Sequence, residues 1–267
     1  PPEGQGVVAG LDGYRLSPTT AVLDRAGGRF EFTIEGSDGE AERHFEPVHE
    51  RRLHLIIVDR ELTTFHHVHP KLGSDGVWSV DLPALHPGSY RAVADFMIED
   101  GPRLALGSDL AVPGRYQPEQ LADPARTSRT DGYQVAVEID REAGGEIRAS
   151  FTVRRHGRLV TDLEPYLGAD GHLVAMRQGD LAYAHVHPVE DEEPGPGTVS
   201  FEATLDAKGR YGLFLDFKHG GRVHPAAFTF DQGTVTGAAS MEHCHDRTRP
   251  RTDGDHPRDR RHDLRVV

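Results

Sequence analysis

Two histidine-rich motifs carry the clearest metal-binding chemistry of this chain. Each motif reads His, twelve residues, His, one residue, His, Pro. Neutral imidazole is a common ligand of zinc, copper and nickel, and three imidazoles with one further position make a known metal geometry. The motifs therefore predict a three-histidine site for a copper or zinc ion in each half of the chain, formed by His54, His67 and His69 and, 118 positions later, by His172, His185 and His187.

A β-hairpin would bring the three histidines of each motif together. The runs Leu53–Asp59 and Phe65–His69 are rich in β-branched and aromatic residues, and a polar connection separates them. Because side chains at i and i+2 share one face of a strand, His67 and His69 point the same way. A turn centred between residues 60 and 61 predicts His54 opposite His67.

The second motif predicts the same hairpin. Gln178 and Gly179 stand at its turn, where glycine supplies the positive φ that tight hairpins need. This turn predicts His172 opposite His185.

Two aspartates are candidates for completing each site. Asp95 and Asp216 occupy the same place in the repeated pattern Tyr-x4-Asp-Phe. Each carboxylate is expected to act as a fourth ligand or as the hydrogen-bond acceptor that orients a ligating ring.

The elements around these motifs predict an all-β protein. Short alternating runs recur between Gly, Pro and Asp turns, about seven to a unit, and no run has a helical period. We expect two tandem antiparallel β-sandwich domains of immunoglobulin-like size, covering residues 11–113 and 131–232, with a linker over 114–130. Residues 233–267 are polar and predicted to be disordered, and we interpret their His243-Cys244-His245 cluster as incidental.

Composition excludes several classes of function. A net charge of −13 argues against binding nucleic acid, and no apolar run approaches the roughly 18 residues of a membrane helix. The only cysteine is Cys244, so neither motif offers the thiolate of a blue-copper site. Without a recognisable catalytic motif, the chain is not expected to be an enzyme.

The motifs and their flanks resemble a family of bacterial extracytoplasmic proteins, usually left uncharacterised. Its members carry a strand of the form LHLIVV, then FxHxHP, then a glycine-tyrosine strand that ends in Asp-Phe. The matching features are Leu53–Val58, Phe65–Pro70 and Tyr90–Phe96, with Thr161–Pro188 in the second unit, and they span about 220 residues. The resemblance implies immunoglobulin-like or cupredoxin-like domains, secretion or membrane anchoring, and a role with heavy metals such as copper.

Two functions follow from these expectations. The first is an extracytoplasmic protein that holds, buffers or passes copper or zinc, exchanging the ion with a membrane transporter or a metal chaperone. Its export segment would be missing from the given sequence, which begins at Pro1 without an initiator Met. The alternative is a non-catalytic interaction or structural module in which the histidines only stabilise the hairpins.

Overall fold

Apolar residues at alternate positions form the strands of this chain. In β3 (Gly28–Glu35), Phe30, Phe32 and Ile34 are fully buried, whereas the residues between them are more exposed. The computed structural model describes residues 2, 4–141, 145–184, 186–189, 195–205 and 207–233. Strands dominate these residues and no α-helix occurs among them, so the predicted all-β fold of two tandem antiparallel sandwiches is confirmed. The His243-Cys244-His245 cluster lies outside them.

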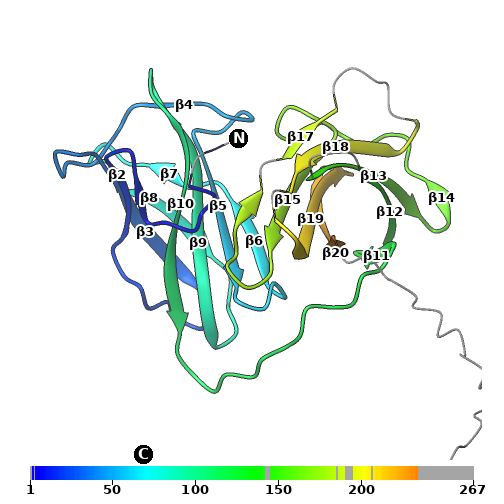
Figure 1. The fold of residues 1–267 in the computed structure, drawn as a ribbon, viewed down its shortest axis with the longest axis horizontal. Coiled ribbons are helices and arrows are strands. Elements are labelled where there is room, and N and C mark those ends of the chain that lie inside the picture. Colours follow the sequence, from blue (N-terminus) through cyan, green and yellow to red (C-terminus); the bar gives the residue numbers. More distant parts are fainter. Residues whose placement is uncertain are drawn as a thin grey trace, which may run out of the picture. The chain divides into compact units, whose positions relative to one another are not determined.

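Two repeats with the same strand order make up this fold (Figure 1). The first repeat contains β1 (Gly10–Leu11), β2 (Tyr14–Pro18), β3, β4 (Phe45–Glu46), β5 (Leu53–Asp59), β6 (Phe65–Val68), β7 (Lys71–Leu72), β8 (Trp78–Leu82), β9 (Gly88–Ile98) and β10 (Arg103–Val112). The second contains β11 (Thr127–Thr130), β12 (Tyr133–Arg141), β13 (Glu146–Arg155), β14 (Arg158–Leu159), β15 (His172–Arg177), β16 (Tyr183–Ala184), β17 (Val186–Pro188), β18 (Thr198–Thr204), β19 (Gly209–His219) and β20 (Arg222–Gln232).

Each repeat has one sheet that carries its first motif histidine. In the first repeat this histidine sheet has the order β10-β9-β5-β6, and in the second it has the order β20-β19-β15-β16. The opposite sheets are β1-β2-β3-β8-β7 and β11-β12-β13-β18-β17, again in matching order. This correspondence is the structural counterpart of the 118-residue spacing in the sequence.

A separate apolar core fills each sandwich. Phe32, Trp78 and Phe96 belong to the first, and Phe151, Phe217 and Phe228 belong to the second. The Trp78 ring lies 5.1 Å from the Phe45 ring and 6.4 Å from the Phe32 ring, centroid to centroid. Each repeat therefore buries its own core between its two sheets.

Strand β5 is buried on both faces. Leu53, Leu55 and Ile57 point into the first repeat's own core, whereas Ile56 and Val58 belong to a third cluster that includes residues of the second repeat. We call this cluster the boundary core; it comprises Ile56, Val58, Leu62, Val93, Ala105, Leu121, Val174, Met176, Leu181, Tyr183 and Phe214, with Phe65 packed against it. The Phe65 and Phe214 rings stack at 4.1 Å within it. The two repeats thus form one compact unit.

Two connecting segments hold the repeats at this boundary. The residues before β1 donate a hydrogen bond from the Gly6 amide to the Ala105 carbonyl (2.9 Å), and the Gln5 carbonyl accepts one from the Tyr183 amide (2.7 Å). In the segment that joins the repeats, Leu121 enters the boundary core and Asp123 pairs with Arg210 (3.2 Å). β11 occupies the last four residues of the predicted linker and pairs with β12.

No helix within the described residues has the length and apolar character that crossing a membrane requires.

Candidate functional site

The first histidine hairpin has a longer turn than the sequence suggests. Asp59 ends β5, and its carboxylate accepts hydrogen bonds from the backbone amides of Thr63 (2.7 Å) and Thr64 (2.9 Å). This Asp-stabilised loop moves the pairing by two residues, so that His67 lies opposite Ile56. The predicted pairing of His54 with His67 is wrong, but a shift of two keeps both side chains on the same face.

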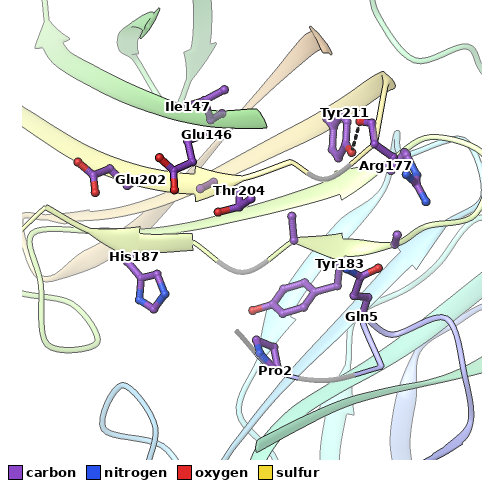
Figure 2. Close-up of a pocket in the computed structure, with 14 residues that line it drawn as sticks. Pro2, Gln5, Glu146, Ile147, Arg177, Tyr183, His187, Glu202, Thr204 and Tyr211 are labelled. Atoms are coloured by element: carbon purple, nitrogen blue, oxygen red, sulfur yellow. Dashed lines mark hydrogen bonds between the residues drawn. The ribbon is translucent and has the colours of Figure 1, made fainter. Parts of the chain in front are cut away.

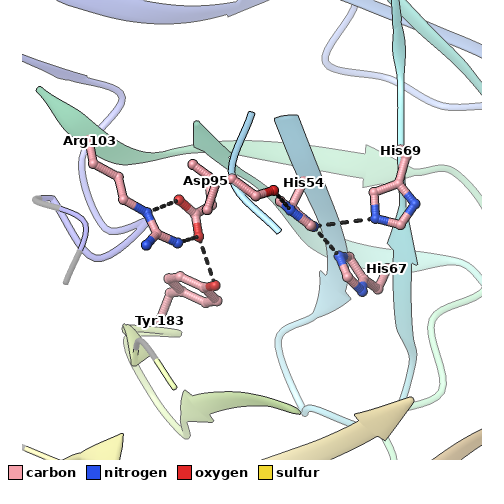
Figure 3. A network of polar contacts seen from close by, with 7 residues as sticks. His54, His67, His69, Asp95, Arg103 and Tyr183 are labelled. Atoms are coloured by element: carbon pink, nitrogen blue, oxygen red, sulfur yellow. Dashed lines mark hydrogen bonds and ion pairs between the residues drawn. The ribbon is translucent and has the colours of Figure 1, made fainter. Parts of the chain in front are cut away.

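The nitrogens of His54, His67 and His69 converge on that face (Figure 3). His54 Nδ1 lies 2.9 Å from His67 Nε2 and 3.3 Å from His69 Nε2. One nitrogen from each ring lies within 4.8 Å of the others. Metal–nitrogen bonds of roughly 2.0–2.1 Å place two ligand nitrogens of a tetrahedral site roughly 3.3 Å apart, so these separations fit one ion.

Hydrogen bonds on the outer side of two rings determine where their protons lie. His54 Nε2 donates to the Val48 carbonyl (2.8 Å), and His67 Nδ1 donates to the Asp216 carboxylate (3.2 Å). Because both partners can only accept, each neutral ring carries its hydrogen on that outer nitrogen. A doubly protonated His67 would donate a hydrogen bond from Nε2 to His54 Nδ1, whereas in the neutral form the two inner nitrogens, 2.9 Å apart, face each other with lone pairs. This is the arrangement of metal-ligating histidines whose second nitrogen is held by an oxygen.

The second repeat contributes directly to this cluster. The His172 ring, on β15, stacks on His54 at 5.4 Å and on His67 at 4.7 Å. Asp216, on β19, is directly opposite His172 in the strand pair. His49, in the loop before β5, lies 5.6 Å from His172 and 6.0 Å from His54, centroid to centroid.

Burial keeps three of these imidazoles neutral. Desolvation, followed by the electrostatic influence of the neighbouring His67, lowers the pKa of His54 from 6.5 to about 2 and that of His69 to about 3. Burial and the neighbouring histidines also lower the pKa of His172 well below its usual value. Neutral imidazole is the form that ligates metals, so His54, His69 and His172 are in the ligating state at neutral pH.

Asp95 has a different role from Asp216. It lies opposite His54 in the strand pair, but its carboxylate pairs with Arg103 (3.0 Å) and accepts a hydrogen bond from the Tyr183 hydroxyl (2.9 Å) (Figure 3). The guanidinium of Arg103 therefore balances its charge. Asp95 joins the repeats through Tyr183, which belongs to the second, and burial together with the Asp95 charge raises the pKa of that hydroxyl well above its usual value.

The second motif is arranged differently from the first. Ala175 pairs with Ala184 and Met176 with Tyr183, again two residues from the predicted register. After Ala184 the chain leaves the histidine sheet, and β17 pairs with β18 of the opposite sheet, so that His187 lies opposite Glu202. His187 is exposed, whereas His172 packs against His54 and His67; His185 lies outside the described residues.

His187 instead lines a cavity of about 340 Å³ beside Tyr183 (Figure 2). Glu146 and Glu202 from β13 and β18 also line this cavity, and Pro2 and Gln5 lie along it. Burial, followed by the neighbouring Arg103, lowers the pKa of His49.

Sequence reasoning missed two contributors to the site. Val48 supplies a backbone carbonyl, which leaves no signal in the side-chain pattern, and His49 has no counterpart in the second motif. The placement of His172 beside the first motif was also not foreseen. The sequence did contain a sign of this contact. The central residues of β5 and β15 are continuously apolar, which is typical of strands buried on both faces.

Comparison with known proteins gives a family but no activity. A family model described as a domain of unknown function (DUF8832) matches residues 9–108 and 128–234, one match for each repeat. No curated protein matches the chain.

Among solved structures, the tetra-tandem repeat in the extending region of a large adhesion protein is 16% identical, with a TM-score of 0.28. The match covers 81% of this chain and 48% of that one, so the chain spans about half of its length. InvD of Yersinia pseudotuberculosis is 9% identical (TM-score 0.25; 82% and 57% covered), and domains 5-6 of the S-layer protein SbsC are 12% identical (TM-score 0.24; 83% and 100% covered). These TM-scores are too low to support an argument.

Proposed function

The chain belongs to the family described as a domain of unknown function (DUF8832), and we propose that it binds one zinc or copper ion through His54, His67 and His69. Its role is to hold, buffer or pass that ion outside the cytoplasm, without catalysis, and a membrane transporter or metal chaperone is its exchange partner. The location rests on the sequence resemblance, the partner follows from the proposed passing of the ion, and the site rests on the geometry of the three rings.

One observation carries the proposal. When both rings are neutral, the outer hydrogen bonds to Val48 and Asp216 leave His54 Nδ1 and His67 Nε2 as two lone-pair nitrogens 2.9 Å apart. Two acceptors at that distance repel each other unless a cation lies between them. A metal ion bound by both nitrogens removes this repulsion without protonating either ring.

Calorimetric titration with Zn(II) and Cu(II) tests this function. The full chain is used with His243, Cys244 and His245 changed to Ala, so that only the folded repeats contribute ligands. We expect about one ion per chain at the His54 site, and His67→Ala should abolish its uptake because it removes one of three ligands.

His66→Ala is the matched control. His66 precedes His67 on β6 and pairs with Ile57, whose side chain points into the first repeat's own core. The rings of His66 and His67 therefore lie on opposite faces of the sheet. The control should bind as the unsubstituted chain does. If neither metal binds, or if both variants bind equally well, the histidines only stabilise the hairpin and the chain is better described as a structural module.

A further inference from the structure

The His172 ring lies against two of the three imidazoles of the cluster. The ring centroids of His54, His67 and His69 lie 5.2, 5.0 and 4.8 Å apart. His172 lies 5.4 Å from His54 and 4.7 Å from His67, which are the same spacings. Around an ion bound tetrahedrally by imidazoles at roughly 2.0–2.1 Å, neighbouring ring centres lie roughly 5 Å apart.

We propose that His172 is the fourth ligand, so that a single ion bridges the two repeats. This inference rests on the proposed function, because it assumes that His54, His67 and His69 hold the ion. It differs from the arrangement that the sequence suggests, in which His172 belongs to a separate site in the second repeat.

The surroundings of His172 suit a bound dication. Its strand partner Asp216 is a buried residue, 8% exposed, and the Asp216 carboxylate already contacts His67. Asp95, the corresponding carboxylate of the first repeat, is balanced by Arg103. A dication bound by these imidazoles would lie near the Asp216 carboxylate and offset its negative charge in a site with little water.

Bridging couples ion binding to the docking of the repeats. The boundary core adjoins the cluster, since Ile56 and Val174 lie two residues after His54 and His172 on the same faces of β5 and β15. An ion that contacts both repeats stabilises the docked state, and contacts that stabilise docking must raise the affinity for the ion by the same factor.

The first experiment compares His172→Ala with His156→Asn, which changes an exposed histidine of the same repeat. Zn(II) affinity is measured by competition with a chromophoric chelator, and Co(II) absorption reports the number of ligands. His172→Ala should weaken Zn(II) binding at least tenfold and change the Co(II) spectrum, while His156→Asn should change neither. Unchanged affinity and spectrum in His172→Ala would overturn the inference.

The second experiment leaves every ligand in place. Phe214→Leu alters the boundary core, whereas Phe228→Leu alters the second repeat's own core, and the two phenylalanines are similarly buried, at 6% and 5% exposure. Phe214→Leu should weaken Zn(II) binding more than Phe228→Leu, because only Phe214 contributes to docking. Equal affinities in the two folded variants would contradict the coupling.

The outcomes separate the two proposals. If the unsubstituted chain binds no ion, the proposed function fails and this inference fails with it. If the unsubstituted chain binds an ion and His67→Ala abolishes binding but His172→Ala does not, only the fourth ligand is wrong.

Discussion

Asp216 lies outside the proposed set of three ligands, but it orients one of their rings. Its carboxylate accepts a hydrogen bond from Nδ1 of His67, which belongs to the other repeat, and this leaves His67 Nε2 facing His54. Removing such an orienting carboxylate lets the ring take the other tautomer and rotate.

Asp216→Asn should therefore weaken Zn(II) binding about 10- to 100-fold without removing a ligand. Asp131→Asn is the control, because Asp131 also accepts a hydrogen bond from a histidine, His224 (2.9 Å), in a different part of the second repeat. Chelator competition on both variants checks the difference, and equal affinities would show that Asp216 does not orient a ligand.

The buried imidazoles also predict how the stability of the metal-free chain depends on pH. The unfolded chain protonates its histidines near 6.5, whereas in the folded chain the pKa of His54 is about 2 and that of His69 about 3. Above 6.5 both states are neutral and these groups add no pH dependence. As the pH falls from 6.5 towards 3, the unfolded state binds protons that the folded state does not, so the free energy of unfolding decreases.

Urea unfolding in the presence of a metal chelator, at pH 7.5 and at pH 5, measures this effect. The midpoint should be lower at pH 5, and the difference should shrink in a His54→Leu, His69→Leu double variant. A midpoint that does not move between the two pH values would show that these rings are not held neutral by the fold.

At the scale of elements, the segment before β1 depends on two close backbone contacts. Gly107 donates its amide to the Val8 carbonyl (2.8 Å), and a Cβ at Gly107 would lie 1.8 Å from the Gly6 carbonyl oxygen. The segment therefore packs on β10 only because glycine stands at position 107.

Gly107→Ala should displace this segment and lower the free energy of unfolding by about 1–3 kcal/mol, the usual cost of overpacking. Gly195→Ala serves as the control, because nothing lies within 4 Å of a Cβ placed there. Urea unfolding gives the energies, and hydrogen exchange at the Gly6 and Tyr183 amides reports release of the segment. Unchanged exchange in Gly107→Ala would contradict this role.

The sequence predicts the strands better than their register. Alternation identifies β3 and its counterpart β13 because each has one face in a core. The predicted hairpin register was wrong by two residues. The Asp59 carboxylate lengthens the turn by accepting hydrogen bonds from the amides of Thr63 and Thr64, and a polar loop sequence does not reveal such bonds. The departure of β17 to the opposite sheet also could not be inferred, because the two motifs read alike.

For the whole molecule, the doubled strand order follows from the 118-residue spacing, but the assembly of the site does not. The sequence predicts two equivalent histidine sites. The structure brings His54, His67 and His69 together and places the His172 ring against two of them, while His187 lies exposed on β17. The position of His172 depends on which faces of the two repeats pack together. Apolar side chains such as Ile56 and Val174 determine that packing, not the histidines.

The boundary core has matching residues on its two sides: Ile56 corresponds to Val174, and Val58 to Met176. A patch that packs against its own counterpart is typical of two-fold homodimers, which dissociate on dilution. Here residues 113–126 tether the two patches, so their encounter is intramolecular and its strength is set by an effective concentration rather than by the amount of protein present. The two sides of the boundary core should therefore stay in contact at very low protein concentration, where two separate chains with the same patches would dissociate.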